Sequence, residues 1–146
     1  MILEPLIQQG SPPMSGDSSR NAGSRGSGGG APGPAAAPVI AVRMESLLAW
    51  LAERVAKFPR DHRFTVGDRL LHACLDITEH LVEASYRRDK RTDLAAASRG
   101  LVRARILMRL AHALRCVSEA QHLQFARESD EIGEMLGGWL RSAHPR

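Results

Sequence analysis

The chain has 146 residues, a formal net charge of +4 at pH 7, a sequence pI near 9.8 and only 4% aromatic residues. Its first seven residues, MILEPLI, are apolar too briefly for a signal peptide or a membrane span, so we expect neither. No CxxC or clustered Cys/His spacing occurs in the sequence, and we expect no metal and no other cofactor.

Residues 1–40 are rich in Gly, Ser, Pro and Ala and hold few side chains that could bury surface. This composition is typical of a disordered leader. We therefore expect one small folded domain over residues 41–146.

The first half of this domain carries two helical patterns. Apolar residues at i, i+3, i+4 and i+7 form the first stripe, through Met44, Leu47, Leu48, Leu51, Val55 and Phe58. Pro59 ends this helix, because proline disfavours helical geometry at the residue before it. Thr65 and Asp68 form a variant capping box that opens the second helix. Its stripe runs through Val66, Leu70, Ala73, Cys74, Ile77, Leu81 and Ala84.

The charged segment 87–91 connects the second helix to a third. Thr92 or Asp93 can cap this third helix, whose apolar arc is Leu94, Leu101, Ala104, Leu107, Met108, Ala111 and Leu114. Ser118 and Gln121 form a capping box for a fourth helix, with apolar residues at Leu123, Ile132, Met135, Leu136 and Trp139. Short connections make successive helices antiparallel neighbours, so the predicted fold is all-α, an up-down four-helix bundle.

Two features of the later helices bear on packing. Gly133 and Gly137 indicate either a close approach between helices or a helix end at Gly137. The third helix is apolar on a second side as well, through Val102, Ile106, Leu110 and Ala113. A small bundle can bury that second side only against another chain, which favours a homo-oligomer.

Positive charge is concentrated between Arg87 and Arg115, a segment that holds nine basic residues and only two acidic ones. These are our candidate binding residues for nucleic acid or a partner: Arg87, Arg88, Lys90, Arg91, Arg99, Arg103, Arg105, Arg109 and Arg115. Arginine suits phosphates and carboxylates equally. The basic face could therefore bind RNA or DNA, bind an acidic protein, or form salt bridges between subunits with Asp76, Glu79 and Glu83.

Other candidate sites are weaker. His72, Asp76 and His80 share one helix face, but three ligands spread over two turns are too far apart for one ion. Cys74 and Cys116 lie within helical patterns, which indicates buried thiols in a reducing cytoplasm rather than a disulfide. The serines lack a paired base at a recognisable spacing, so we do not expect an enzyme, and a small nuclease is the least favoured hypothesis.

Two runs of the sequence are unusual, namely 58–70 (FPRDHRFTVGDRL) and 130–140 (DEIGEMLGGWL). Together with LVEA at 81–84, Tyr86 and RILMRLA at 105–111, they resemble the accessory variability determinant proteins of diversity-generating retroelements. These are relatives of four-helix-bundle proteins encoded in intervening sequences of ribosomal RNA genes. The likeness covers residues 44–141.

The resemblance implies a homopentameric barrel that binds RNA and DNA and pairs with the reverse transcriptase of the same element during mutagenic retrohoming. It maps the basic features of the family onto Arg103, Arg105, Arg109 and Arg115, and it implies neither a catalytic nor a membrane role. A structural or adapter oligomer, whose arginines serve only subunit or protein contacts, remains the alternative.

Overall fold

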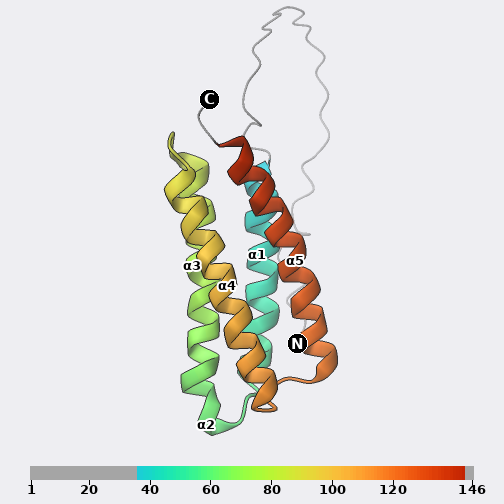
Figure 1. Ribbon diagram of the computed structural model, residues 1–146. Coiled ribbons are helices and arrows are strands. Elements are labelled where there is room, and N and C mark those ends of the chain that lie inside the picture. Colours follow the sequence, from blue (N-terminus) through green and yellow to red (C-terminus); the bar gives the residue numbers. More distant parts are fainter. Residues whose placement is uncertain (1–35, 144–146) are drawn as a thin grey trace, which may run out of the picture.

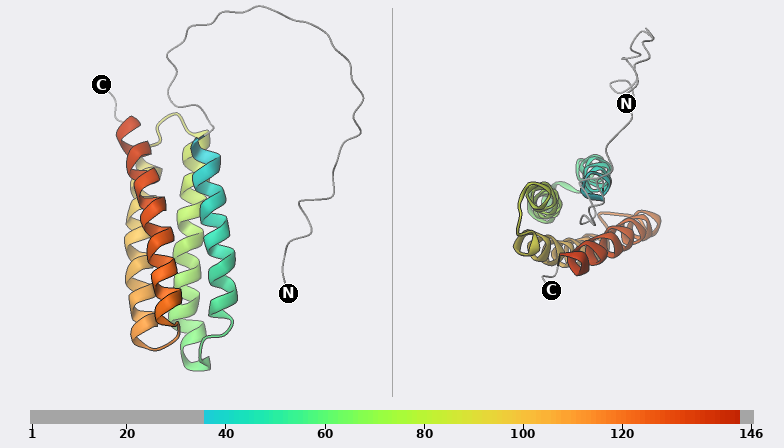
Figure 2. Two further views of the ribbon diagram at one scale, coloured as in Figure 1. Left: turned by 90° about the vertical axis from the view of Figure 1, so that its right-hand side faces the viewer. Right: turned by 90° about the horizontal axis from the view of Figure 1, so that it is seen from above.

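A computed structural model describes residues 36–143, where the chain forms four long helices and two short ones. The long helices are α1 (Ala36–Val55), α3 (Asp68–Tyr86), α4 (Arg91–Ala113) and α5 (Glu119–Ser142). The short ones are α2 (Arg60–His62) and the π-helix η1 (Arg63–Gly67), which lead into α3. Successive long helices run antiparallel (Figure 1), with α1 and α3 on one side of the bundle and α4 and α5 on the other (Figure 2). The predicted four-helix bundle is confirmed.

The core lies along the bundle axis and is built from the predicted stripes. The most deeply buried side chains include those of Met44, Leu51, Leu70, Ile77 and Leu81, which are fully buried. All seven residues of the second stripe are buried as well. The stripe of α5 agrees with the predicted one at Ile132, Leu136 and Trp139 but not at Leu123. It runs through Phe125, Ser129, Ile132, Leu136 and Trp139, whereas Leu123 is 48% exposed. Two residues turn an α-helix by about 200°, so Leu123 and Phe125 lie on opposite sides.

The predicted cap at Thr65 is wrong, because the chain is already helical at Arg60. Pro59 is the N-cap residue of α2, and the helix continues through the wider turn of η1 into α3 without a break. The Thr65 hydroxyl donates to the carbonyl of Asp61 at 3.4 Å, as serine and threonine do inside helices. Proline pre-sets the backbone for entry into a helix and therefore starts this one earlier than the cap pattern indicated.

Neither Thr92 nor Asp93 caps α4. The N-cap position is Lys90, and the Asp89 carboxylate accepts from the backbone nitrogen of Arg91 at 3.2 Å. The capping box of α5 is confirmed: Ser118 Oγ accepts from Gln121 N at 3.1 Å, and Gln121 Oε1 accepts from Ser118 N at 2.9 Å.

The bundle begins earlier than the expected domain boundary at residue 41. Helix α1 starts at Ala36, and Ile40 is 1% exposed in the core. Residues 36–40 therefore belong to the bundle, while residues 1–35 of the expected leader and residues 144–146 lie outside the described residues.

For the glycines of α5 we had two interpretations, a close approach between helices or a helix end at Gly137, and the structure supports the first. Helix α5 continues to Ser142, so Gly137 does not end it. A Cβ at Gly133 would lie 3.0 Å from Arg105 Nη2 and 3.3 Å from Leu101 Cδ2. Gly133 thus permits the close approach of α4 to α5. Between residues 36 and 143, no helix is long and apolar enough to cross a membrane.

Candidate nucleic-acid and subunit interface

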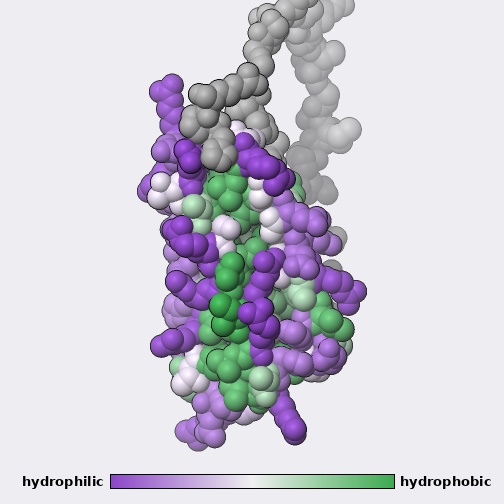
Figure 3. All heavy atoms as spheres, viewed as in Figure 1, coloured by the Kyte–Doolittle hydropathy of each residue, from purple (hydrophilic) through white to green (hydrophobic). Residues whose placement is uncertain are grey.

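The outward side of α4 carries an apolar strip, formed by Val102, Ile106 and Leu110. These side chains are 53%, 51% and 44% exposed. Their spacing of four residues places them one above another on the helix surface. A hydrophobic band runs down this face of the molecule, with hydrophilic side chains on both sides of it (Figure 3). The second apolar side predicted for this helix is therefore open in the single chain.

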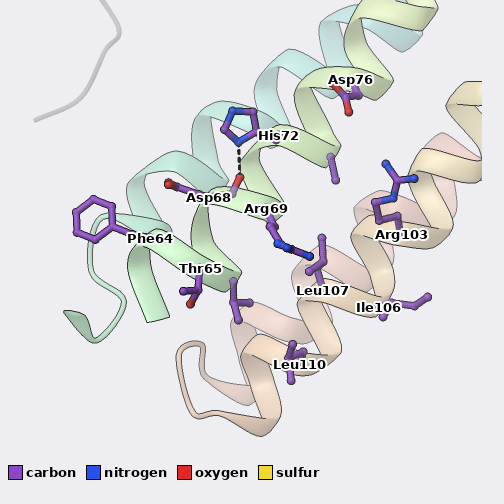
Figure 4. Close-up of a pocket in the computed structure, with 12 residues that line it drawn as sticks. Phe64, Thr65, Asp68, Arg69, His72, Asp76, Arg103, Ile106, Leu107 and Leu110 are labelled. Atoms are coloured by element: carbon purple, nitrogen blue, oxygen red, sulfur yellow. Dashed lines mark hydrogen bonds between the residues drawn. The ribbon is translucent and has the colours of Figure 1, made fainter. Parts of the chain in front are cut away.

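A groove of about 870 Å³ borders the strip, between α4 and the segment formed by η1 and the first half of α3. Ile106, Leu107 and Leu110 form its α4 wall. Arg69 extends from α3 toward Leu107 (Figure 4). Phe64, on η1 at the groove, is 68% exposed.

The same groove is lined by charges of both signs. Asp68, Arg69 and Asp76 come from α3, and Arg103 comes from α4. His72 also lines it, with its Nδ1 2.8 Å from the carbonyl oxygen of Asp68. An apolar surface bordered by both acids and bases suits a protein surface better than a polyanion, because phosphates would meet the two carboxylates.

The nine candidate residues do not form one continuous patch. Arg103 lines the groove, whereas Arg109 lies on the α5 side of the strip, in a hollow lined by His122 and Phe125. Arg115 is exposed at the far end of α4, where its φ of 61° is the left-handed conformation that ends the helix.

Arg105 has a structural role in the protomer. Its Nη2 donates to the carbonyl of Ser129 at 3.0 Å and to Asp130 Oδ1 at 3.2 Å, and its Nε lies 3.4 Å from Ser129 Oγ. The side chain is 34% exposed, and its ion pair with Asp130 links α4 to α5. Its donors are largely engaged within the protomer.

Two basic residues of the 87–91 connection also hold the fold. Lys90 Nζ donates to the carbonyls of Ala84 at 2.9 Å and Arg87 at 2.8 Å, which satisfies the end of α3. Arg87 contacts Glu83 at 3.5 Å and Asp93 at 3.4 Å. Asp93, which we predicted as a possible cap, is instead 5% exposed and lies 3.2 Å from His80 Nδ1.

Arg88, Arg91 and Arg99 differ from these two. They are exposed, and none of them makes an ion pair within residues 36–143. Arg91 and Arg99 are about 12 Å apart along α4, close to the connection that carries Arg88. We call these three residues the basic end; it lies at the end of the bundle where α1 begins and α5 finishes (Figure 1).

The amino-acid sequence of the chain matches a known protein family. The profile of the bAvd-like family matches residues 38–143, which is nearly all of the described chain. The chain belongs to the bAvd-like family. This confirms the resemblance to accessory variability determinant proteins, a family of accessory rather than catalytic proteins. No curated protein matches the chain.

Within residues 36–143, no group of three His, Cys, Asp or Glu side chains is placed to hold a metal ion. His72 contacts a backbone carbonyl, and His80 contacts the buried carboxylate of Asp93, so each has a local partner. What this bAvd-like chain presents outward is an apolar strip, a mixed-charge groove and a basic end.

Proposed function

We propose that this chain is a non-enzymatic, cytoplasmic accessory subunit of a diversity-generating retroelement. It binds nucleic acid and pairs with the reverse transcriptase of the same element during synthesis of mutagenic cDNA from template RNA. Family membership supports the accessory role. The single observation that carries nucleic-acid binding is the basic end, where three exposed arginines lack carboxylate partners within the described residues.

The proposal includes a homo-oligomer, which the family resemblance makes a pentamer. We place the subunit interface on the apolar strip. Three large apolar side chains on one exposed stripe are unfavourable in water and gain free energy when a second chain covers them.

The subunit interface is tested by the double variant Ile106→Glu and Leu110→Glu. Two charges on the strip would have to be desolvated on assembly, so light scattering should give the mass of a single chain. Leu123→Glu, on an equally exposed position of α5, is the control and should assemble like the wild type. A double variant that keeps the wild-type mass would show that the strip is not the interface.

Nucleic-acid binding is tested by removing the basic end with Arg88→Gln, Arg91→Gln and Arg99→Gln. Phosphate contacts release counterions, so the slope of log affinity against log salt should become shallower by roughly two to three. Arg87 and Lys90 are left in place because they hold the connection. The control removes three exposed charges elsewhere with Lys57→Gln, Arg60→Gln and Arg127→Gln. An unchanged slope in the first variant would refute the assignment.

Pairing with the polymerase is tested by charge reversal at Arg103 and Arg109, one on each side of the strip. If these arginines serve the polymerase, Arg103→Glu with Arg109→Glu abolishes cDNA synthesis in a reconstituted system, and the oligomer stays intact. Normal synthesis by an intact oligomer would exclude both residues from this role.

One observation favours the alternative of a structural or adapter oligomer. Arg103 lines the same groove as Asp68 and Asp76, a setting that suits contacts between subunits. Under this alternative, the Arg103→Glu and Arg109→Glu variant falls apart into single chains, and the basic-end variant has no effect on the cellular role.

A further inference from the structure

Tyr86 is the last residue of α3 and the only tyrosine of the chain. It is 86% exposed, more than any other large apolar side chain of the described residues. Tyrosine usually buries most of its ring and gives its hydroxyl a partner. Within residues 36–143, the ring packs into no core and the hydroxyl makes no hydrogen bond. The fold therefore gains little from this side chain.

The surroundings of Tyr86 are basic. Arg87 and Arg88 follow it directly, and α4 begins with Arg91 on the other side of the connection. The nearby acids are already engaged. Glu83 and Asp93 contact Arg87 at 3.5 and 3.4 Å, and Asp89 accepts from the backbone of Arg91. Residues 87–91 hold four basic side chains and one acid, Asp89, so the charge beside Tyr86 is positive overall. Arg88 and Arg91 make no ion pair within residues 36–143.

The connection that carries these groups is held in place. Lys90 bonds two carbonyls across the turn, and Arg87 is fastened to the buried carboxylate of Asp93. The ring and its two arginines are thus presented on a supported turn. A ligand that binds there pays little entropy for ordering the backbone.

We propose that Tyr86 is a stacking platform for an unpaired base, and that Arg88 and Arg91 bind the flanking phosphates. The site then selects single-stranded over double-stranded nucleic acid. An aromatic ring in a basic setting binds single strands without reading their sequence, because every base offers a flat face. In a duplex those faces are covered by the neighbouring bases. This inference rests on the proposed nucleic-acid binding and specifies its substrate.

The test compares full-length wild type with Tyr86→Ala on three probes of about 15 units, namely oligo(U), oligo(dT) and a DNA duplex. Loss of one stacked base should weaken single-strand binding by roughly five-fold to 150-fold. Duplex affinity and the salt slopes on all probes should stay unchanged, because no charge is removed. Tyr86→Phe should bind like the wild type, and Leu123→Ala removes an exposed apolar side chain at the other end of the bundle as a control.

Equal losses on oligo(U) and oligo(dT), or a loss on one of them, both support stacking, and the second pattern also identifies the strand. Unchanged single-strand binding by Tyr86→Ala refutes the inference, as does an equal loss on the duplex, which would mean that the turn had collapsed. Dissociation of the oligomer would make Tyr86 an interface residue instead. If the wild type binds none of the probes, the proposed function itself fails.

Discussion

At the scale of single residues, Gly100 shows how closely α3 and α4 pack. A Cβ there would lie 2.8 Å from Cγ1 of Ile77, which is fully buried. We expect Gly100→Ala to destabilise the protein by about 1–3 kcal/mol, because the core must shift to admit the methyl group.

The matched control is Gly138→Ala on α5, where the new Cβ would lie 3.8 Å from Nη2 of Arg141, the flexible end of that side chain. Alanine favours a helix over glycine by about 1 kcal/mol, so this variant should gain stability. Urea unfolding measures both variants. A Gly100→Ala protein as stable as Gly138→Ala would show that α3 and α4 are less closely packed than described.

The two cysteines should differ in reactivity. Burial raises the pKa of the Cys74 thiol to about 12, and desolvation also raises the pKa of Cys116, which is more accessible. The thiolate is the nucleophile, so at pH 8 Ellman's reagent should label Cys116 slowly and leave Cys74 untouched until the chain is denatured. Equal rates for both thiols in the native protein would contradict the burial of Cys74.

At the scale of the helix, α3 and α5 begin in different ways although both show a capping pattern. In α5, Ser118 and Gln121 satisfy each other's backbone donors. In the helical run before α3, Thr65 lies five residues inside, and its hydroxyl only donates back to Asp61. The two similar sequence patterns therefore contribute differently to helix stability.

This difference predicts that Ser118→Ala costs about 1 kcal/mol and Thr65→Ala less than about 0.5 kcal/mol. Thermal and urea unfolding of the two variants, compared at one protein concentration, measure it. If Thr65→Ala lost more stability than Ser118→Ala, this would support Thr65 as the residue that caps the start of the helix.

At the scale of the whole molecule, the extent of the bundle can be tested by truncation. A chain that starts at residue 36 retains all of α1, whereas one that starts at residue 41 lacks the buried Ile40. Burial of an isoleucine contributes about 1.5–3 kcal/mol, so the shorter chain should be less stable by roughly that amount. Urea unfolding at equal protein concentration measures the difference, because an oligomer's stability depends on concentration. Equal stability would restore the boundary at residue 41.

The sequence does not show which of the candidate basic residues have partners within the bundle, because those partners are distant in the chain. Nine basic residues between Arg87 and Arg115 were grouped by sequence alone. Arg105 bonds residues 24 and 25 positions away on α5, and Arg87 contacts a carboxylate that the fold has buried. No local pattern reveals such partners, so the sequence could not tell arginines that hold the bundle from those that remain exposed.

The sequence by itself determined the four helices, most of their buried stripes and the second apolar side of α4. Helical periodicity depends on residues three and four positions apart, which the sequence displays directly. Only the tertiary structure decided that α5 turns Phe125 inward, that Asp93 is buried beside His80, and that Arg88, Arg91 and Arg99 form the basic end. These outcomes depend on which helix lies next to which, because a charged side chain finds its partner through space and not along the chain.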